Sequence, residues 1–228
     1  MTSFVFAPPP APSVAIEGTE QRFPVHRIYC VGRNYADHVR EMGGDPKRQA
    51  PIFFSKPADA LVASGAAVPY PPRTANFHHE IELVVALGRG GKSIGREHAL
   101  EHVFGYAVGN DFTRRDLQHG ARSAGQPWDT SKGFYHSAAV SAIRPASRVA
   151  ALSGRIWLAV NGTLRQQADI AEMIWNVPEI IAELSTLFEL APGDLLYTGT
   201  PAGVGALERG DRVTGGIEGI GTLENTIV

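Results

Sequence analysis

Two glutamates, Glu80 and Glu82, stand at the start of a strongly apolar run that ends at Leu87. Such a run is typical of a β-strand buried on both faces, and side chains two positions apart in a strand share a face, roughly 7 Å apart. Two like charges leading into a buried strand repel each other unless a positive charge lies between them. A hard divalent cation is the simplest candidate. The alternative is an edge strand with two solvated glutamates.

Asp111 is the best candidate for a third oxygen ligand, because it follows the strand-like stretch 106–110 and precedes a predicted helix. Strand ends are places where side chains on a rigid frame converge on a site. Three carboxylates without a cysteine favour an oxygen-binding ion, Mg²⁺ first, with Mn²⁺ or Ca²⁺ as alternatives. Such a site leaves coordination positions for water and a chelating substrate. The adjoining His78 and His79 are expected to be solvated or hydrogen-bonded rather than to bind the ion.

Three further residues could move a proton or hold a charge. His38 and Glu41 are three positions apart, so a helix would place them on one face, where the carboxylate would orient the imidazole as a general base for water. The alternative is a chance pair on a solvated helix. Lys132, flanked by small residues and followed by aromatic ones, could stabilise an enolate or hold a carboxylate. The alternative there is a surface lysine.

Short elements must position these residues. The sequence predicts a strand at about 27–31 and a helix over 35–41, followed by the loop Gly43–Pro46, which could belong to a mobile lid or be an ordinary surface connection. It also predicts strands at 52–54 and 104–109 and a short helix near 96–103.

The region after Asp111 resembles a capping box, with Thr113 and Asp116 opening a helix of about three turns. On that helix Arg115 and Gln118 are three positions apart and should share a face.

The second half of the chain predicts three features. Asn161-Gly162 between two apolar runs predicts a β-hairpin. Pro178 is expected to start an amphipathic helix whose apolar stripe faces the core. The stripe consists of Ile180, Ile181, Leu184, Leu187 and Phe188. The last forty residues are expected to be rich in strands.

Composition limits the classes of protein. The chain has 228 residues, with 25 glycines and 16 prolines that favour turns and short strands over long helices. Its net charge of −2 gives no electrostatic footprint for nucleic acid, and no apolar stretch approaches the length of a membrane span. The single cysteine, Cys30, excludes an internal disulfide and is expected to be a buried structural thiol. The N-terminus is a poor signal peptide, so a cytoplasmic location is expected.

Together these residues resemble the fumarylacetoacetate hydrolase superfamily from about residue 25 to the C-terminus. The resemblance rests on an ordered set of motifs: Val31-Gly32-Arg33-Asn34-Tyr35 with His38 and Glu41, His79-Glu80-Ile81-Glu82-Leu83, Asp111-Phe112-Thr113-Arg114-Arg115-Asp116 with Gln118, Ser131-Lys132-Gly133-Phe134, and 198–205. The segment 34–38 looks like the acylpyruvate hydrolase branch. The start of the chain, with Phe23-Pro24-Val25, looks like fumarylpyruvate hydrolases of gentisate degradation.

The resemblance implies a fold and a set of roles. The expected fold is a mixed β-sandwich roll, predominantly β with short peripheral helices, in which 1–24 form an N-terminal extension and 25–228 one catalytic domain. The implied metal ligands are Glu80, Glu82 and Asp111, the water-activating pair is His38 and Glu41, and the enolate-stabilising lysine is Lys132. Implied substrate contacts are Arg115, Gln118 and Thr200, with Arg33 as a further one. A homodimer is also implied.

The reaction expected from this resemblance is metal-dependent hydrolysis of a carbon–carbon bond in a 2,4-dioxo acid, with fumarylpyruvate giving fumarate and pyruvate. A distal carboxylate would need an arginine, Arg33 or Arg40, and Phe112 could help to select the acyl group. The alternatives are an acylpyruvase or oxaloacetate decarboxylase, an enzyme acting on longer homoprotocatechuate intermediates, and a metal-stabilised binding protein without turnover.

Overall fold

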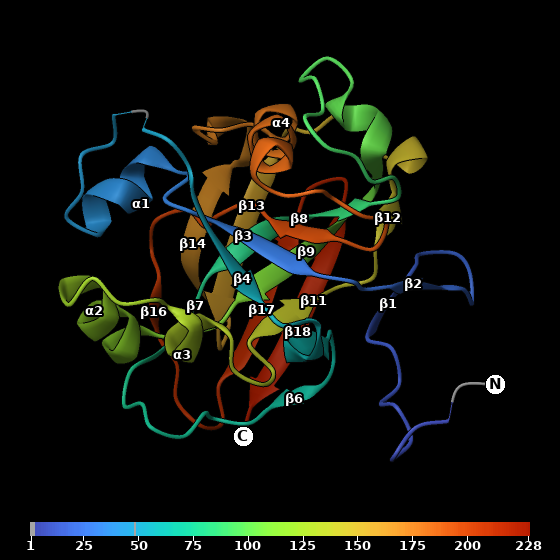
Figure 1. Cartoon of the computed structure of the whole chain (residues 1–228). Coiled ribbons are helices and arrows are strands. Elements are labelled where there is room, and N and C mark those ends of the chain that lie inside the picture. The colour runs from blue at the N-terminus through green and yellow to red at the C-terminus, as the bar shows by residue number, and fades with distance from the viewer. Residues whose placement is uncertain (1–2, 48) are drawn as a thin grey trace.

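The larger of two packed β-sheets runs through the middle of the molecule (Figure 1). This computed structural model describes residues 3–47 and 49–228. In those residues the large sheet consists, in spatial order, of β4 (Ile52–Lys56), β3 (Ile28–Gly32), β15 (Leu195–Tyr197), β8 (Ile81–Leu87), β9 (Val103–Asp111), β11 (Ala138–Val140) and β5 (Leu61–Ala63), with β12 (Arg144–Pro145) also paired to β9. The second sheet consists of β14 (Thr163–Asp169), β13 (Arg155–Val160), β17 (Arg212–Ile217), β18 (Gly221–Ile227) and β6 (Ala67–Val68).

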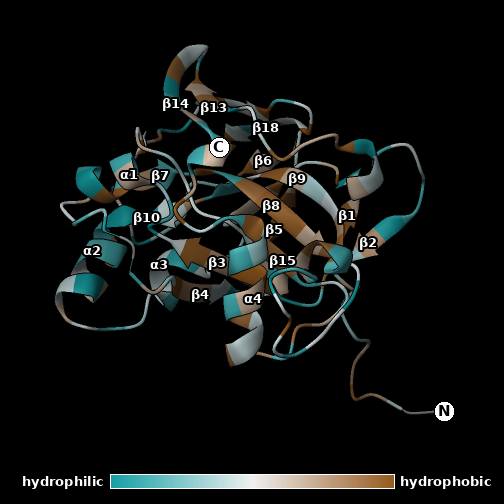
Figure 2. Ribbon diagram, turned by 90° about the horizontal axis from the view of Figure 1, so that it is seen from above, coloured by the Kyte–Doolittle hydropathy of each residue, from teal (hydrophilic) through white to brown (hydrophobic). Residues whose placement is uncertain are grey.

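Strand β8 lies at the centre of the large sheet, and each of its residues is buried. It pairs antiparallel with both β15 and β9. Its side chains alternate between two faces, and each face packs against one of the two hydrophobic clusters of the core. The second sheet approaches closely at Gly215, where a Cβ atom would lie 2.6 Å from Cδ1 of Ile81. Only glycine permits that approach. Figure 2 shows how hydrophobic residues are distributed over the fold, with hydrophobic strands at the centre and more hydrophilic helices at the periphery.

Smaller elements surround these sheets. A three-stranded sheet contains β10 (Thr113–Arg114), β7 (Phe77–His79) and β16 (Gly205–Ala206), and a hairpin pairs β1 (Ser13–Ala15) with β2 (Arg22–Pro24). The α-helices are α1 (Ala36–Glu41), α2 (Arg115–Ser123), α3 (Asp129–Lys132) and α4 (Val177–Leu187). Short 3₁₀ turns are η1 (Ala58–Ala60), η2 (Ala99–His102), η3 (Ala146–Arg148) and η4 (Ile170–Glu172). No helix among the described residues is long and apolar enough to span a bilayer.

The fold class expected from the sequence is confirmed, and the predicted strands at 27–31, 52–54 and 104–109 correspond to β3, β4 and β9. The predicted hairpin is β13–β14. Its turn residues Asn161 and Gly162 have φ values of 51° and 79°, which is the left-handed geometry that an Asn-Gly hairpin turn requires. The hairpin β1–β2 lies within the expected N-terminal extension and was not predicted. Residues 1–2 of that extension lie outside the described residues.

The predicted capping box at Thr113 and Asp116 is wrong. Thr113 belongs to β10 and pairs with His78, and α2 begins without a side-chain cap. The Asp116 carboxylate instead accepts hydrogen bonds from Thr74 Oγ1 at 2.6 Å and from the backbone N–H of Ala75 at 3.0 Å. Strand pairing therefore places Thr113 in β10, whereas the local sequence pattern had assigned it to the start of the helix.

Two helix predictions need smaller corrections. The segment near 96–103 forms only the 3₁₀ turn η2. In α4, Ile180, Ile181 and Leu184 are buried as predicted, whereas Leu187 is 60% exposed and Phe188 is 42% exposed. The apolar stripe therefore runs one turn past the part of α4 that packs on the core.

Candidate metal and substrate site

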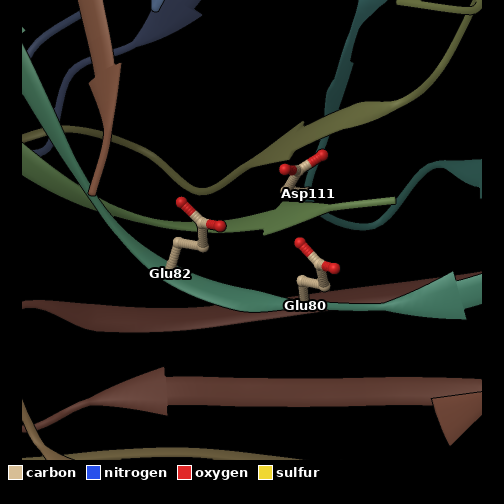
Figure 3. A group of neighbouring side chains, drawn as sticks. All are labelled: Glu80, Glu82 and Asp111. Carbon is tan, nitrogen blue, oxygen red and sulfur yellow. The ribbon is translucent and has the colours of Figure 1, made fainter. Parts of the chain in front are cut away.

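Three carboxylates converge beside the central strands (Figure 3). Glu80 links β7 to β8, Glu82 belongs to β8, and Asp111 ends β9. The backbone N–H of Asp111 donates to the carbonyl of Glu80 at 2.8 Å, which fixes these two residues side by side. One oxygen from each carboxylate lies within 4.8 Å of the others, and all three residues are buried. The edge strand with solvated glutamates is thereby excluded.

Buried cations compensate two of these carboxylates. Lys132 Nζ lies 2.7 Å from Glu80 Oε2 and 2.7 Å from Asp111 Oδ2, and Lys56 Nζ lies 2.8 Å from Asp111 Oδ1. Arg115 also forms an ion pair with Glu80. Lys132 is only 2% exposed, so it is not a surface lysine. Burial alone would lower the pKa of Lys132, but the charges of Asp111 and Glu80 raise it, so the side chain remains an ammonium ion.

Glu82 has no such partner. Among the described residues no cation forms an ion pair with it, and its Oε2 accepts the backbone N–H of Gly199 at 2.7 Å. Gly199 has φ +95°, and a Cβ atom there would lie 2.7 Å from Cβ of Asn34, so the contact needs glycine. Burial, followed by the nearby charges of Asp111 and Glu80, raises the pKa of Glu82 well above its usual range.

This donor set fits a divalent cation. A buried carboxylate without a counter-charge, beside two others, is costly until a cation is bound. An ion that holds its oxygen ligands at 2.0–2.6 Å places them at most roughly 4–5 Å apart, which matches the spacing here. The donors are all carboxylate oxygens, which hard ions such as Mg²⁺ and Mn²⁺ accept.

Helix α1 brings His38 and Glu41 together. His38 Nδ1 lies 3.0 Å from Glu41 Oε2, and Glu41 Oε1 accepts the backbone N–H of Gly203 at 3.0 Å. Burial acts to raise the pKa of Glu41, but the hydrogen bonds from His38 and Gly203 outweigh it and lower the pKa. Because an ionised carboxylate can only accept, Nδ1 of His38 carries its proton and Nε2 is free to accept another.

A cavity of about 600 Å³, counted together with its open mouth, connects these groups. Its lining includes His38, the three carboxylates, Lys132 and all four predicted substrate contacts, which are Arg33, Arg115, Gln118 and Thr200. Glu41 is not among the lining residues and reaches the cavity only through His38.

Gln166 of β14 supports one wall of the site and was missed by sequence reasoning. Its Nε2 donates to Thr200 Oγ1 at 2.8 Å and to the carbonyl of Pro201 at 2.8 Å, and its Oε1 accepts the N–H of Ile81 at 3.2 Å. The same oxygen lies 2.8 Å from Nδ1 of His79. The expectation that His79 forms a hydrogen bond is confirmed, and so is that for His78, whose Nε2 lies 2.7 Å from Asn76 Oδ1.

Other site residues also escaped prediction. Lys56 gave no signal beyond its place at the end of a short strand, and the cavity residues Phe54 and Trp128 gave none. Arg122 could have been found, since it is four positions after Gln118 on the same helix and lies on the same face.

Two expectations about the acyl end are wrong. Arg40 forms an ion pair with Asp37 and does not line the cavity. Phe112 is fully buried, with its ring centroid 5.1 Å from that of Phe77, so it belongs to the core and cannot contact the acyl group. Cys30, by contrast, is fully buried as expected, and burial raises the pKa of its thiol.

Comparisons with known proteins agree with this geometry. The sequence pattern described as fumarylacetoacetate (FAA) hydrolase C-terminal matches residues 27–228. A fumarylpyruvate hydrolase of Ralstonia sp. is 48% identical over 183 residues, which cover 80% of this chain and 95% of that protein. The mitochondrial oxaloacetate tautomerase of Rattus norvegicus is 43% identical over 194 residues, covering 85% and 87%.

A solved structure is also closely similar. The crystal structure of fumarylpyruvate hydrolase from Pseudomonas aeruginosa in complex with Mn²⁺ and pyruvate has a TM-score of 0.97 and 52% sequence identity, and the match covers 99% of each chain.

Proposed function

This chain belongs to the fumarylacetoacetate hydrolase family, and we propose that it hydrolyses fumarylpyruvate to fumarate and pyruvate with a divalent cation bound by Glu80, Glu82 and Asp111. It is a hydrolase that acts on carbon–carbon bonds. The observation that carries the proposal is the convergence in one cavity of a buried carboxylate triad, a histidine oriented by a carboxylate, and a buried ammonium group. Mg²⁺ is our first choice of ion and Mn²⁺ the second, because the similar crystal structure is described with Mn²⁺.

The cation would act as a template and Lewis acid for the carboxylate and adjacent keto oxygen of the pyruvoyl end. The protein's own groups complete that end of the site. Arg115 and Gln118, hydrogen-bonded to each other, would donate to the pyruvoyl carboxylate, and Thr200 also lines the cavity.

Proton transfer is assigned to α1. His38 Nε2 takes a proton from water, while Glu41 holds Nδ1 and stabilises the imidazolium that forms. The water oxygen bonds to the carbonyl carbon at position 4, and the bond between carbons 3 and 4 breaks. The electron pair remains on the pyruvoyl fragment as an enolate, the acyl fragment leaves as fumarate, and the proton held by His38 goes to carbon 3 to give pyruvate.

Lys132 stabilises the enolate. Two of its three N–H groups are directed to Glu80 and Asp111, which leaves one for a substrate oxygen. Its raised pKa keeps it charged, so it acts as an electrostatic stabiliser rather than as a base.

The balance of buried charge supports a dianionic substrate. Three cations, Lys56, Lys132 and Arg115, are paired with Glu80 and Asp111, so the cluster has no net charge when all three carboxylates are ionised. A bound divalent ion therefore adds two positive charges that a substrate with two negative charges would neutralise. Fumarylpyruvate carries a carboxylate at each end. We further propose that the enzyme is a homodimer and that the reaction belongs to gentisate degradation.

One relative supports a second candidate, chemistry on oxaloacetate, since the rat protein named oxaloacetate tautomerase is 43% identical to this chain. Oxaloacetate shares the 2-oxo acid end of acylpyruvates, so the same cation and arginine would bind it. The inner end of the site therefore does not distinguish the two substrates.

The test is a substrate panel. The purified protein with Mg²⁺ or Mn²⁺ is incubated with fumarylpyruvate, acetylpyruvate and oxaloacetate, and the ultraviolet absorbance of the dioxo acids is followed. We expect the highest kcat/KM for fumarylpyruvate, with fumarate and pyruvate in equal amounts. Faster turnover of acetylpyruvate or oxaloacetate would move the protein to the sister activity, and no turnover of any of them would favour a binding protein.

A further inference from the structure

Two arginines at the outer end of the cavity have no carboxylate partner among residues 3–47 and 49–228. Arg33 and Arg122 both line the cavity, and within the described part of the chain neither guanidinium forms an ion pair. The inner Arg115, by contrast, is paired with Glu80. Burial, together with the nearby charge of Arg122, lowers the pKa of Arg33, so the two cations are close enough to repel each other. An anion bound between them would remove that repulsion.

Arg33 is also held in an unusual backbone conformation. Its φ of 60° is in the left-handed region, which is uncommon for a residue with a side chain. The next residue, Asn34, is fully buried and fixes this turn, since its Nδ2 donates to the carbonyls of Thr198 at 2.7 Å and Trp175 at 2.9 Å. Backbone strain of this kind persists where the surroundings over-determine it and is concentrated at ligand sites.

Helix α2 sets the distance between the two ends of the cavity. Arg115, Gln118 and Arg122 occupy one face, at positions i, i+3 and i+7, and all three line the cavity. At about 1.5 Å per residue, the Cα atoms of Arg115 and Arg122 are roughly 10 Å apart along the helix. Arg122 also donates to the carbonyl of Met42 at 3.3 Å, which connects α2 to the end of the helix that carries His38.

We propose that Arg33 and Arg122 bind a second carboxylate at the far end of the substrate, and thereby select seven-carbon 2,4-dioxo diacids. This inference rests on the proposed function. An extended chain of seven carbons has six bonds of about 1.5 Å, which separates its terminal carboxyl groups by roughly 7–8 Å. That length spans from Arg115 to the outer arginines. Oxaloacetate, with three such bonds, is too short, and acetylpyruvate has no distal charge.

A pair of ligands that cannot be hydrolysed isolates this anchor. 2-Oxoheptanedioate and 2-oxoheptanoate have the same length and the same 2-oxo acid end, and only the first has a distal carboxylate. With the metal-loaded protein we expect the diacid to bind about 10- to 100-fold more tightly by calorimetry, as one bidentate charge-assisted contact provides. Arg122→Gln and Arg33→Gln should each reduce that difference, and the double variant should abolish it.

The control is Arg40→Gln, because Arg40 lies on the neighbouring α1 but is paired with Asp37 outside the cavity. It should keep the full preference for the diacid. The inference is overturned if the wild-type protein binds the two acids equally, or if Arg122→Gln weakens both by the same factor.

Steady-state turnover provides a second test of the distal anchor. Arg122→Gln should lower kcat/KM for fumarylpyruvate about 10- to 100-fold and for acetylpyruvate by less than about 3-fold. Equal losses on both substrates contradict the anchor. Failure of the proposed function looks different, since a wild-type protein that prefers the diacid in binding but hydrolyses no acylpyruvate retains the anchor and loses only the reaction.

Discussion

The inner and outer ends of the cavity are built in opposite ways. At the inner end Glu80, Glu82 and Asp111 belong to or adjoin the central strands β8 and β9, and each is at most 4% exposed. At the outer end Arg122 belongs to α2 and Arg33 lies between β3 and α1, and Glu41 and Arg122 are exposed. Figure 1 places α1 and α2 on one flank of the large sheet. Among the described residues the buried end pairs Glu80 and Asp111 with cations and leaves Glu82 for a metal ion, whereas the open end leaves Arg33 and Arg122 for a ligand.

The two ends also differ in what holds their elements in place. Helix α1 has only six residues, and isolated helices of this length are unstable in water. It is held by the buried Val39 and by two polar links, from Gly203 to Glu41 and from Arg122 to Met42. Such links can break and re-form as substrate enters. We therefore expect the metal site to persist when α1 is perturbed. We do not expect α1 to keep its position when the metal site is perturbed.

The largest effect should come from the inner end. Exhaustive chelation should lower turnover by roughly 10³-fold or more, because the Lewis acid contributes several kcal/mol of charge stabilisation. Added Mg²⁺ or Mn²⁺ should restore it. Glu82→Gln, which removes the carboxylate without a cation partner, should abolish metal binding measured by calorimetry. Full activity of the chelated protein would show that the inner end is structural.

The next effect tests the outer end alone. His38→Ala should lower kcat by about 10²- to 10⁴-fold while metal affinity stays within about 2-fold, because the imidazole is a general base and not a ligand. The matched control is His98→Ala, since His98 forms the same contact with Glu101, Nδ1 to Oε1 at 3.0 Å, on an exposed helical turn. Wild-type kcat in His38→Ala would remove α1 from the mechanism.

That pair of histidines also shows what sequence could provide. A histidine and a glutamate three positions apart occur at both 38–41 and 98–101, and both pairs form the hydrogen bond that the spacing predicts. Of the two histidines, His38 lines the cavity of the carboxylate site and His98 does not, which depends on how β3 and the 198–205 loop are brought together. The family resemblance selected the pair whose histidine lines this cavity, whereas local spacing alone does not distinguish the two pairs.

The carboxylates were predictable for a different reason. Alternation along β8 and the position of Asp111 at a strand end are local properties, and strand pairing preserves them. Lys56 and Gln166 were not predictable, because their contacts with the site come from β4 and β14, which are distant in sequence from the groups that they support. The capping box failed at Thr113 because pairing with β7 outweighed a local preference.

Lys56 offers an intermediate test of the inner end. Its ammonium group pairs with Asp111 and also donates to the carbonyls of Lys132 and Phe112, so it supports both a proposed metal ligand and the proposed enolate-binding lysine. Lys56→Met should lower the free energy of unfolding by about 3–5 kcal/mol, the usual cost of breaking a buried ion pair, and metal affinity by about 10- to 100-fold.

The control for Lys56 is Lys47→Met, because Lys47 pairs with Asp45 at the surface, where an ion pair contributes little. Urea unfolding and calorimetry provide the two measurements. If Lys56→Met and Lys47→Met behave alike, the inner end does not depend on internal charge pairing, and the contrast between the two ends loses its physical basis.

The smallest effect should appear at Glu41, where the outer end has its own hydrogen-bonded carboxylate. The pKa of Glu41 is lowered in the folded protein, so its ionised form stabilises the fold at any pH above its unfolded pKa of about 4.3. That stabilisation is lost as the pH falls through the lowered folded pKa. Glu41→Gln keeps the shape of the side chain, but it removes the charge and replaces one of the two acceptor oxygens with an NH₂ donor.

We therefore expect Glu41→Gln to be less stable than the wild type by at most about 1 kcal/mol at pH 7, because the side chain is 32% exposed and solvent screens the pair. The difference should persist down to about pH 4.5 and narrow below about pH 4. Urea unfolding at a series of pH values measures it. A difference that does not change with pH would mean that Glu41 stabilises α1 through its hydrogen bonds with His38 and Gly203 and not through its charge.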